Sequence, residues 1–172
     1  TVNFQEGCYL ASLLDCVEET MLLYNGKIIT MDKDLGVLEN GFVRVENGII
    51  TQVGENGPTA QPGEEQVDLA GGALYPGFVD AHSHIGLMED GLGVEGDDVN
   101  EEGDPVTPQL KAIDGINPFE RCFQEARMSG VTTVVVSPGS ANPVGGQICA
   151  LKTAGRWVDE MAIAVPLAIK FA

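Results

Sequence analysis

The two histidines of this 172-residue chain sit one residue apart, at the end of the short run Tyr75-Pro-Gly-Phe-Val-Asp-Ala-His-Ser-His84. Side chains at positions i and i+2 of a strand share a face, so we expect His82 and His84 to project together, with Asp80 beside them. Imidazole nitrogens are common ligands of zinc and related metals. The spacing predicts half of a metal site. Because two ligands do not complete a site of three or four, a hydrogen-bonded histidine pair at a strand end remains the alternative.

The elements around the histidines have the pattern of a parallel α/β unit. The apolar residues 74–81 predict a buried strand, and residues 85–116 predict a long loop. A helix and the β-branched run 131–136 follow, which completes a strand–helix–strand unit and predicts a parallel sheet. Such sheets build their sites at the carboxyl ends of the strands, where the histidines lie. Further strands are expected over 147–152 and 162–171.

The helix after the long loop has sequence signals at both ends. Asn117 is a good N-cap, Pro118 suits the first helical position, and Glu120 suits the third. Gly130 suits the position just after the helix, where a left-handed backbone conformation is common. These signals predict a helix that begins after Asn117 and ends before Gly130.

Residues 21–74 predict a small antiparallel β module. Asn47-Gly48 is a strong hairpin signal, because both residues readily take the positive φ angles of a type I′ turn. With that turn, Val45 faces Ile50 across the hairpin. We also expect a strand pair formed by 22–24 and 27–30, and another strand near 66–69. Residues 1–20 are expected to form a peripheral extension.

Three segments together resemble the start of the amidohydrolase superfamily, closest to its imidazolonepropionase-like branch: Met21–Gly54, Pro76-Gly-Phe-Val-Asp-Ala-His-Ser-His84 and Gly130-Val-Thr-Thr-Val134. The resemblance implies an α/β fold that contains the first strands of a TIM-like (β/α)8 barrel, preceded by the β-rich module of a composite β-sandwich. The implied organisation is an extension over 1–20, a β-sandwich module over 21–74, and the N-terminal part of a metal-dependent hydrolase barrel over 75–172.

By this resemblance, His82 and His84 are metal ligands from the first barrel strand, and the metal is a divalent ion with zinc as the first choice. The Asp80 carboxylate is expected to orient one of the two histidines. The alternative role of Asp80 is to close off the barrel core. The family takes further histidines and a catalytic aspartate from later strands. This chain has no third histidine, and an eight-stranded barrel needs about 250 residues. No catalytic residue is therefore expected within the chain, because the family aspartate would lie beyond residue 172.

The resulting hypothesis is the N-terminal fragment of a metal-dependent amidohydrolase. Such an enzyme hydrolyses a C–N bond of an amide or cyclic amide, a small-molecule substrate, with a metal-activated water. The fragment alone is expected to be inactive. The alternative is a non-catalytic fragment that oligomerises with a second copy or pairs with the rest of the barrel, because an incomplete barrel exposes edges and apolar faces.

Two further places carry weaker signals. Gly145, Gly146 and Gln147 end a glycine-rich loop after the strand 131–136, which either touches substrate or forms a tight turn. Some family members bridge two metals with a carboxylated lysine. Lys170 follows an apolar run and either takes that role or is an ordinary strand-end lysine, which is the favoured interpretation.

The segment 89–104 contains eight acidic residues and no basic residue. Asp98, Asn100 and Glu102 imitate the first half of a calcium loop, but Pro105 interrupts the pattern. A solvated loop over the mouth of the site is the favoured interpretation. The field of such a loop would favour cationic substrates over anionic ones.

The bulk composition excludes several classes of partner. The net charge of −17, from 9 basic and 26 acidic residues, disfavours nucleic acid and anionic membrane surfaces. No apolar run is long enough to span a bilayer. The four cysteines form no Cys-x-x-Cys pair, which favours reduced thiols and a cytoplasmic location.

Overall fold

The computed structural model describes residues 20–90 and 92–172, which form two compact units that meet between residues 76 and 77. The predicted extension lies outside the described residues, except for Thr20. Among the described helices, none is both long and apolar enough to cross a bilayer.

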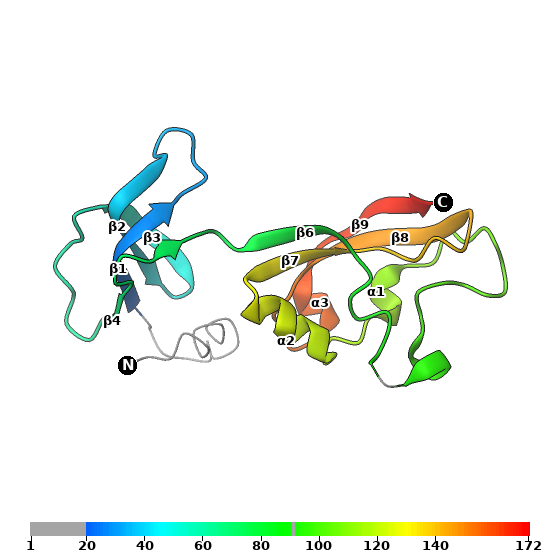
Figure 1. Cartoon of the computed structure of the whole chain (residues 1–172). Coiled ribbons are helices and arrows are strands. Elements are labelled where there is room, and N and C mark those ends of the chain that lie inside the picture. The colour runs from blue at the N-terminus through cyan, green and yellow to red at the C-terminus, as the bar shows by residue number, and fades with distance from the viewer. Residues whose placement is uncertain (1–19, 91) are drawn as a thin grey trace. The chain divides into compact units, whose positions relative to one another are not determined.

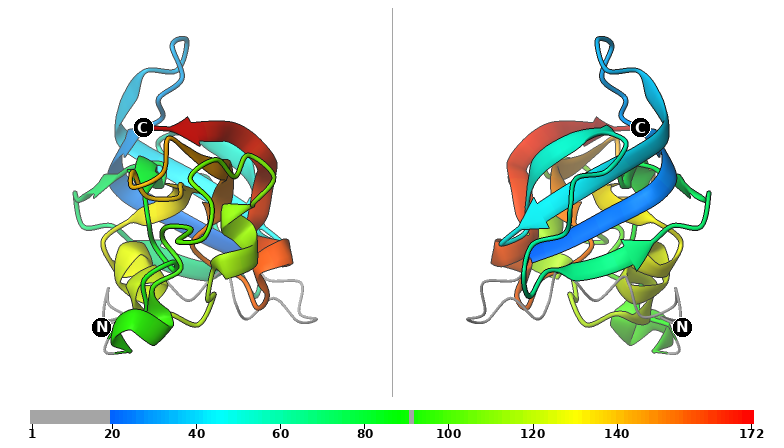
Figure 2. Two further views of the ribbon diagram at one scale, coloured as in Figure 1. Left: turned by 90° about the vertical axis from the view of Figure 1, so that its right-hand side faces the viewer. Right: turned by 90° about the vertical axis from the view of Figure 1, so that its left-hand side faces the viewer.

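The first unit is a β sheet with both antiparallel and parallel strand pairs (Figures 1 and 2). Its strands follow the order β3-β2-β1-β4, and β5 also pairs with β1. The strands are β1 (Thr20–Ile29), β2 (Val37–Glu46), β3 (Ile49–Glu55), β4 (Glu65–Asp68) and β5 (Ala73–Leu74). β1 runs antiparallel to β2 but parallel to β4 and β5.

The predicted hairpin is confirmed, whereas the predicted strand pair before it is wrong. Asn47 and Gly48 have φ angles of 51° and 75°, and Val45 pairs with Ile50. The residues expected to form two short strands instead form the single strand β1. Asn25, with φ of 58°, lies at an irregularity in the register between β1 and β2. An Asn-Gly dipeptide can therefore give a bulge inside a strand as well as a turn between strands.

The second unit is a four-stranded sheet in the order β6-β7-β8-β9. Its strands are β6 (Phe78–Ser83), β7 (Val131–Val136), β8 (Val144–Lys152) and β9 (Ala162–Phe171). β6 and β7 are parallel, as predicted, but β8 runs antiparallel to both of its neighbours, so the sheet is mixed. The short loop 137–143 explains this difference, because a parallel connection needs a crossover of a dozen or more residues.

Three short helices lie on one side of this sheet in Figure 1. They are α1 (Ala112–Gly115), α2 (Arg121–Met128) and α3 (Val158–Met161), and a 3₁₀ turn, η2, covers Gly93–Gly96. α2 packs on β7, whereas α1 and α3 pack on β8. The core between these layers centres on Phe123, Val136 and Leu151, which are all almost fully buried.

The predicted helix begins later than expected. The side chain of Asn117 accepts a hydrogen bond from the backbone amide of Phe119 at 3.0 Å, and Glu120 is the N-cap. Asn117 therefore closes a turn that precedes the helix, because its side chain accepts from an amide of that turn and not from one of the first helical amides. The end is as predicted, with Gly130 at a φ of 85° directly after the helix cap.

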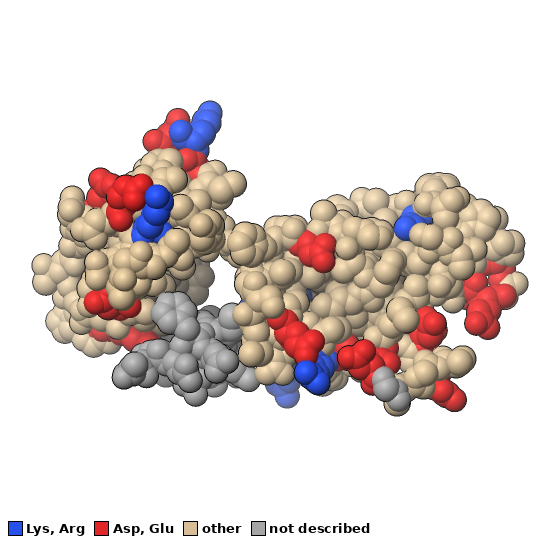
Figure 3. Space-filling model, in the orientation of Figure 1, with Lys and Arg blue, Asp and Glu red and all other residues tan. Residues whose placement is uncertain are grey.

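Strand β6 was expected to be buried, but its apolar side chains are exposed in the described structure. Phe78 and Val79 are 56% and 63% exposed. Alternate residues of β9 are also exposed, namely Ile163, Val165, Leu167, Ile169 and Phe171. The helices pack mainly on the two central strands, and these apolar side chains of the outer strands stay exposed. Acidic side chains outnumber basic ones on the surface that Figure 3 draws.

A buried ion pair holds the loop before β4 against the first sheet. Arg44, on β2, donates from Nε to Oε1 of Glu64 at 2.6 Å and from Nη2 to Oε2 at 3.2 Å. Arg44 also donates to the carbonyl of Thr59, and Glu64 accepts from the amide of Gln61. The Arg44 guanidinium holds the pKa of the Glu64 carboxyl below its usual value. Arg44 also donates from Nη1 to Oε1 of Gln52 on β3 at 2.8 Å. The pair fixes the loop because Glu64 and the Thr59 carbonyl, both on the loop, are held by the same guanidinium.

We predict that Glu64→Gln destabilises the first unit, because it leaves the Arg44 charge buried without its partner. The lowered pKa means that the carboxylate stabilises the fold fully above the pKa of an unfolded glutamate, about 4.3, and loses this effect as the pH falls through the folded pKa. Thermal unfolding of the first unit, monitored through its backbone amide signals, should show that Glu64→Gln lowers the Tm by roughly 5–10 °C at neutral pH. This difference in Tm should shrink in acid. The exposed neighbour Glu65→Gln is the control, and equal Tm values for Glu64→Gln and wild type would contradict the prediction.

Candidate metal site at the end of strand β6

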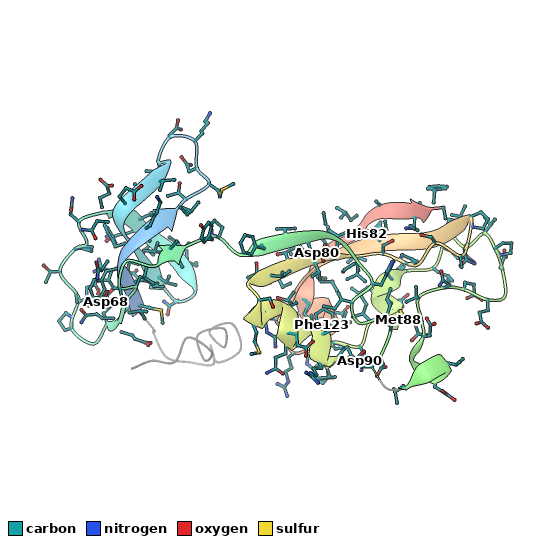
Figure 4. All side chains as sticks on the ribbon, in the orientation of Figure 1. Asp68, Asp80, His82, Met88, Asp90 and Phe123 are labelled. Atoms are coloured by element: carbon teal, nitrogen blue, oxygen red, sulfur yellow. The ribbon has the colours of Figure 1, made fainter. Side chains whose placement is uncertain are left out.

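The two imidazole rings lie side by side where β6 ends. Their centroids are 5.2 Å apart, and the planes meet at 80°. His82 is exposed and His84 is half-buried. Figure 4 shows Asp80 and His82 along β6, above Phe123 of helix α2. The β6–β7 register is irregular between Asp80 and Ser83, so strict strand alternation does not hold here, yet the rings still project together as the spacing predicts.

A backbone carbonyl fixes the protonation pattern of His84. Its Nδ1 lies 2.6 Å from the carbonyl oxygen of Ser137, the first residue after β7. A carbonyl oxygen can only accept, so Nδ1 must carry the proton and donate it. In a neutral ring, the lone pair is then on Nε2, and Nε2 is the atom free to bind a metal. Metal-binding histidines commonly donate their second nitrogen in this way.

Asp80 touches the backbone of the histidine segment. Its Oδ1 accepts a hydrogen bond from the backbone amide of His82 at 3.1 Å. This contact stabilises the irregular end of β6, which carries both rings. The expected contact between the carboxylate and an imidazole ring stays a prediction.

The turn after His84 is closely packed. The amide of Leu87 donates to the carbonyl of His84 at 3.1 Å. Gly86 has a φ of 79°, and a Cβ at this position would lie 2.8 Å from the Phe123 ring and 2.9 Å from the Ile116 side chain. The chain therefore leaves the histidine pair through a turn that has no room for a side chain.

The donor set fits a divalent transition metal, but it is incomplete within the described residues. Residues 20–90 and 92–172 contain no group of three or more His, Cys, Asp or Glu side chains placed to hold a metal. His82 and His84 thus supply two nitrogen ligands at most. The described thiols, Cys122 and Cys149, belong to no such group. Burial raises the pKa of both, that of Cys149 to about 11.

The glycine-rich loop end is packed by the segment before α1. A Cβ on Gly146 would lie 2.7 Å from the carbonyl oxygen of Leu110, and the amide of Gln147 donates to that oxygen at 2.7 Å. Lys170 pairs with Gly146 across the β8–β9 ladder, and its side chain runs beside Gly145. The structure thus gives the glycines a packing role. A substrate contact at Gly145, Gly146 or Gln147, and a metal role for Lys170, stay predictions.

The acidic loop uses several of its side chains to bind its own backbone. Asp97, Glu101 and Asp104 each accept a hydrogen bond from the amide two residues further on. Asn100, one of the three residues that imitate a calcium loop, accepts from the amide of Ala141 at 3.1 Å. Since no group of three His, Cys, Asp or Glu ligands forms among the described residues, the geometry gives the calcium hypothesis no support.

Comparison with known proteins shows which proteins the chain resembles. No family model matches the chain. It is 39% identical over 117 residues to amidohydrolase tasK of Hapsidospora irregularis, and 31% identical over 149 residues to an imidazolonepropionase of Bacillus thuringiensis. These matches cover 66% and 70% of this chain. The crystal structure of an amidohydrolase from Thermotoga maritima superposes on 88% of the chain with a TM-score of 0.78 and 44% identity.

These matches make the chain a partial, N-terminal match to the amidohydrolase superfamily. The chain spans 12% of the Hapsidospora protein, 35% of the Bacillus protein and 38% of the Thermotoga structure. Its mixed α/β architecture with two sheets is therefore that of one portion of an amidohydrolase fold.

The sequence does not reveal the carbonyl of Ser137 as part of the site. Every residue carries a carbonyl, so residue type gives no signal. The only available indication is position, because Ser137 directly follows the strand that pairs in parallel with β6.

We predict that Gly86→Ala destabilises the second unit more than Gly93→Ala. Both glycines have positive φ angles, but a Cβ at Gly93 meets only the flexible end of Glu95. The positive φ alone should cost about 1–2 kcal/mol in each variant. Overpacking against Phe123 and Ile116 should add about 1–3 kcal/mol at Gly86. Denaturant unfolding of the two variants measures the difference, and equal losses would show that the site turn is not sterically closed.

Proposed function

We propose that this chain carries the first two ligands of a metal-dependent hydrolase that cleaves a C–N bond in an amide or cyclic amide. The observation that supports this most is the pair of adjacent imidazoles at the end of β6, with His84 held as the Nδ1–H form by Ser137. A bound divalent ion, with zinc as the first choice, would polarise a substrate carbonyl and lower the pKa of a water molecule.

The residues of the chain would orient the ligands. Ser137 directs Nε2 of His84, and Asp80 fixes the backbone of His82. Relatives named amidohydrolase, 5'-deoxyadenosine deaminase and imidazolonepropionase support C–N hydrolysis as the reaction class. Because the chain spans a minor part of these relatives, further ligands and the group that moves the proton of the water are assigned to the rest of a longer protein. The chain alone should not hydrolyse amides.

Zinc binding tests the ligand assignment directly. The chain of 172 residues, dialysed against buffered zinc, should retain metal by elemental analysis, and the double variant His82→Ala/His84→Ala should lose most of it. Each histidine removed takes away one of two described nitrogen ligands, so each single variant should already weaken binding at least tenfold in a chelator competition.

Val79→Ala is the matched control, because this exposed side chain lies on the same strand and offers no metal ligand. It should bind zinc as wild type does. Equal zinc retention by the double variant would show that the two histidines are not the ligands. A wild-type chain that binds no zinc would show that the two histidines do not hold a metal in the isolated chain.

The outer strands favour a second proposal, which concerns how the sheet is completed. The exposed residues of β9 include five large apolar side chains at alternate positions, and its outer edge is unpaired within the described sheet. We infer that this surface packs against further strands of a TIM-like barrel in a longer protein, and against a second copy when the chain is alone. Exposed apolar edges are poorly tolerated in water, because they bind other chains.

Light scattering of the isolated chain tests this inference. The chain should self-associate with rising concentration, and Leu167→Lys/Ile169→Lys should shift it toward the monomer, because two charges on β9 oppose apolar contact. Val94→Lys adds charge at a side chain that is 84% exposed outside β9 and should leave association unchanged. A wild-type chain that remains monomeric at high concentration would contradict self-association through β9.

A further inference from the structure

Two loops that follow the ends of β6 and β7 are fastened together by backbone and amide groups. We refer to these contacts between residues 97–104 and 137–142 as the loop clasp. Its hydrogen bonds are Gly139 N to Val99 O at 2.8 Å, Ala141 N to Asn100 Oδ1 at 3.1 Å, and Asn142 Nδ2 to the carbonyl oxygens of Glu101 at 2.7 Å and Asp104 at 3.3 Å.

Asn142 is the buried centre of the clasp. It is only 5% exposed, and both of its amide hydrogens have carbonyl partners on the other loop. Its Oδ1 is buried and has no hydrogen-bond partner among the described residues. A buried acceptor without a partner costs about 1–3 kcal/mol, so this side chain is placed for its two donors.

Close backbone contact at Gly139 brings the loops within reach of each other. A Cβ on Gly139 would lie 2.3 Å from Oδ1 of Asn100 and 2.5 Å from the side chain of Val99. No side chain therefore fits at this position unless the loops separate.

The clasp anchors the chain that follows Ser137, whose carbonyl accepts from His84. The Ser137 amide donates to the Ser83 carbonyl at 3.0 Å, which ties the near side of this residue to β6. Beyond the Ser137 carbonyl, the chain continues through Pro138 to Gly139, where the clasp begins. The direction of the carbonyl is thus set between a strand contact on one side and the loop clasp on the other.

We propose that Asn142 is a positioning residue for His84: through the loop clasp it holds the Ser137 carbonyl on Nδ1 and so leaves Nε2 as the ligand atom. The metal role of His84 rests on the proposed function, but the effect on the ring does not. Without the clasp, the Ser137 carbonyl turns away, and the ring becomes free to carry its proton on Nε2.

Two isosteric variants separate this role from an effect of charge. Asn142→Asp keeps the shape of the side chain but replaces the NH2 group, which donates both hydrogen bonds, with an oxygen that faces the two carbonyl oxygens. Asn100→Asp adds the same charge to the same clasp, yet keeps the acceptor for the Ala141 amide. The readout is the ¹⁵N spectrum of the ring nitrogens in the metal-free chain at alkaline pH, where the two histidines of the sequence give two ring systems.

Wild type and Asn100→Asp should show one ring, that of His84, in the Nδ1–H form, whereas Asn142→Asp should show this ring shifted toward the Nε2–H form. Zinc affinity should fall about tenfold in Asn142→Asp alone, the lower end of the range for removing support from a ligand histidine. A folded Asn142→Asp chain that keeps His84 fully in the Nδ1–H form would overturn the proposal. An altered ring with no zinc binding in any variant would leave the positioning role standing and remove the metal role.

Gly139→Ala opens the same clasp sterically, with no change in charge, and decides the question if Asn142→Asp fails to fold. It should change the His84 ring in the same direction. A folded Gly139→Ala chain whose His84 ring matches wild type would overturn the proposal equally.

Discussion

The contact between Nδ1 of His84 and the carbonyl of Ser137 is the interaction on which the candidate site depends. It joins the end of β6 to the end of β7, and it decides which nitrogen of the ring is free. A histidine with two free nitrogens would present either one, whereas this contact leaves a single ligand atom with a fixed direction. The contact exists because β6 and β7 are parallel, so both strands end at the same edge of the sheet.

The parallel pair is in turn held by the helix that connects it. Phe123 of α2 is almost fully buried beside Val134 and Val136 of β7, and it also closes the space above Gly86, directly after the histidines. The position of Phe123 therefore constrains both the packing of the core and the path of the chain through the site. A change that shifts Phe123 would move the turn after His84 as well as loosen the core.

Much of this arrangement could be predicted from local sequence, and the failures have physical causes. The hairpin at Asn47-Gly48, the helix end at Gly130 and the side-by-side histidines follow from backbone preference and strand period. The direction of β8, the turn closed by Asn117 and the exposure of β6 depend on loop length, on competing hydrogen bonds and on which strands the helices cover. At the site, residue type identified the imidazoles, but the Ser137 carbonyl and the clasp around Asn142 arise from contacts between distant segments, which no local pattern encodes.

Two features of the second unit have one physical explanation within the proposed function. The histidine pair offers two metal ligands where a site needs three or four, and the outer strands carry exposed apolar side chains. In a closed barrel, the strands that add ligands also cover the open sheet edges, since barrel closure removes edges and brings strand ends together. The metal and the packing would then be coupled: each strand that completes the coordination of the metal also buries apolar surface. Metal binding and sheet closure should therefore stabilise each other in the longer protein.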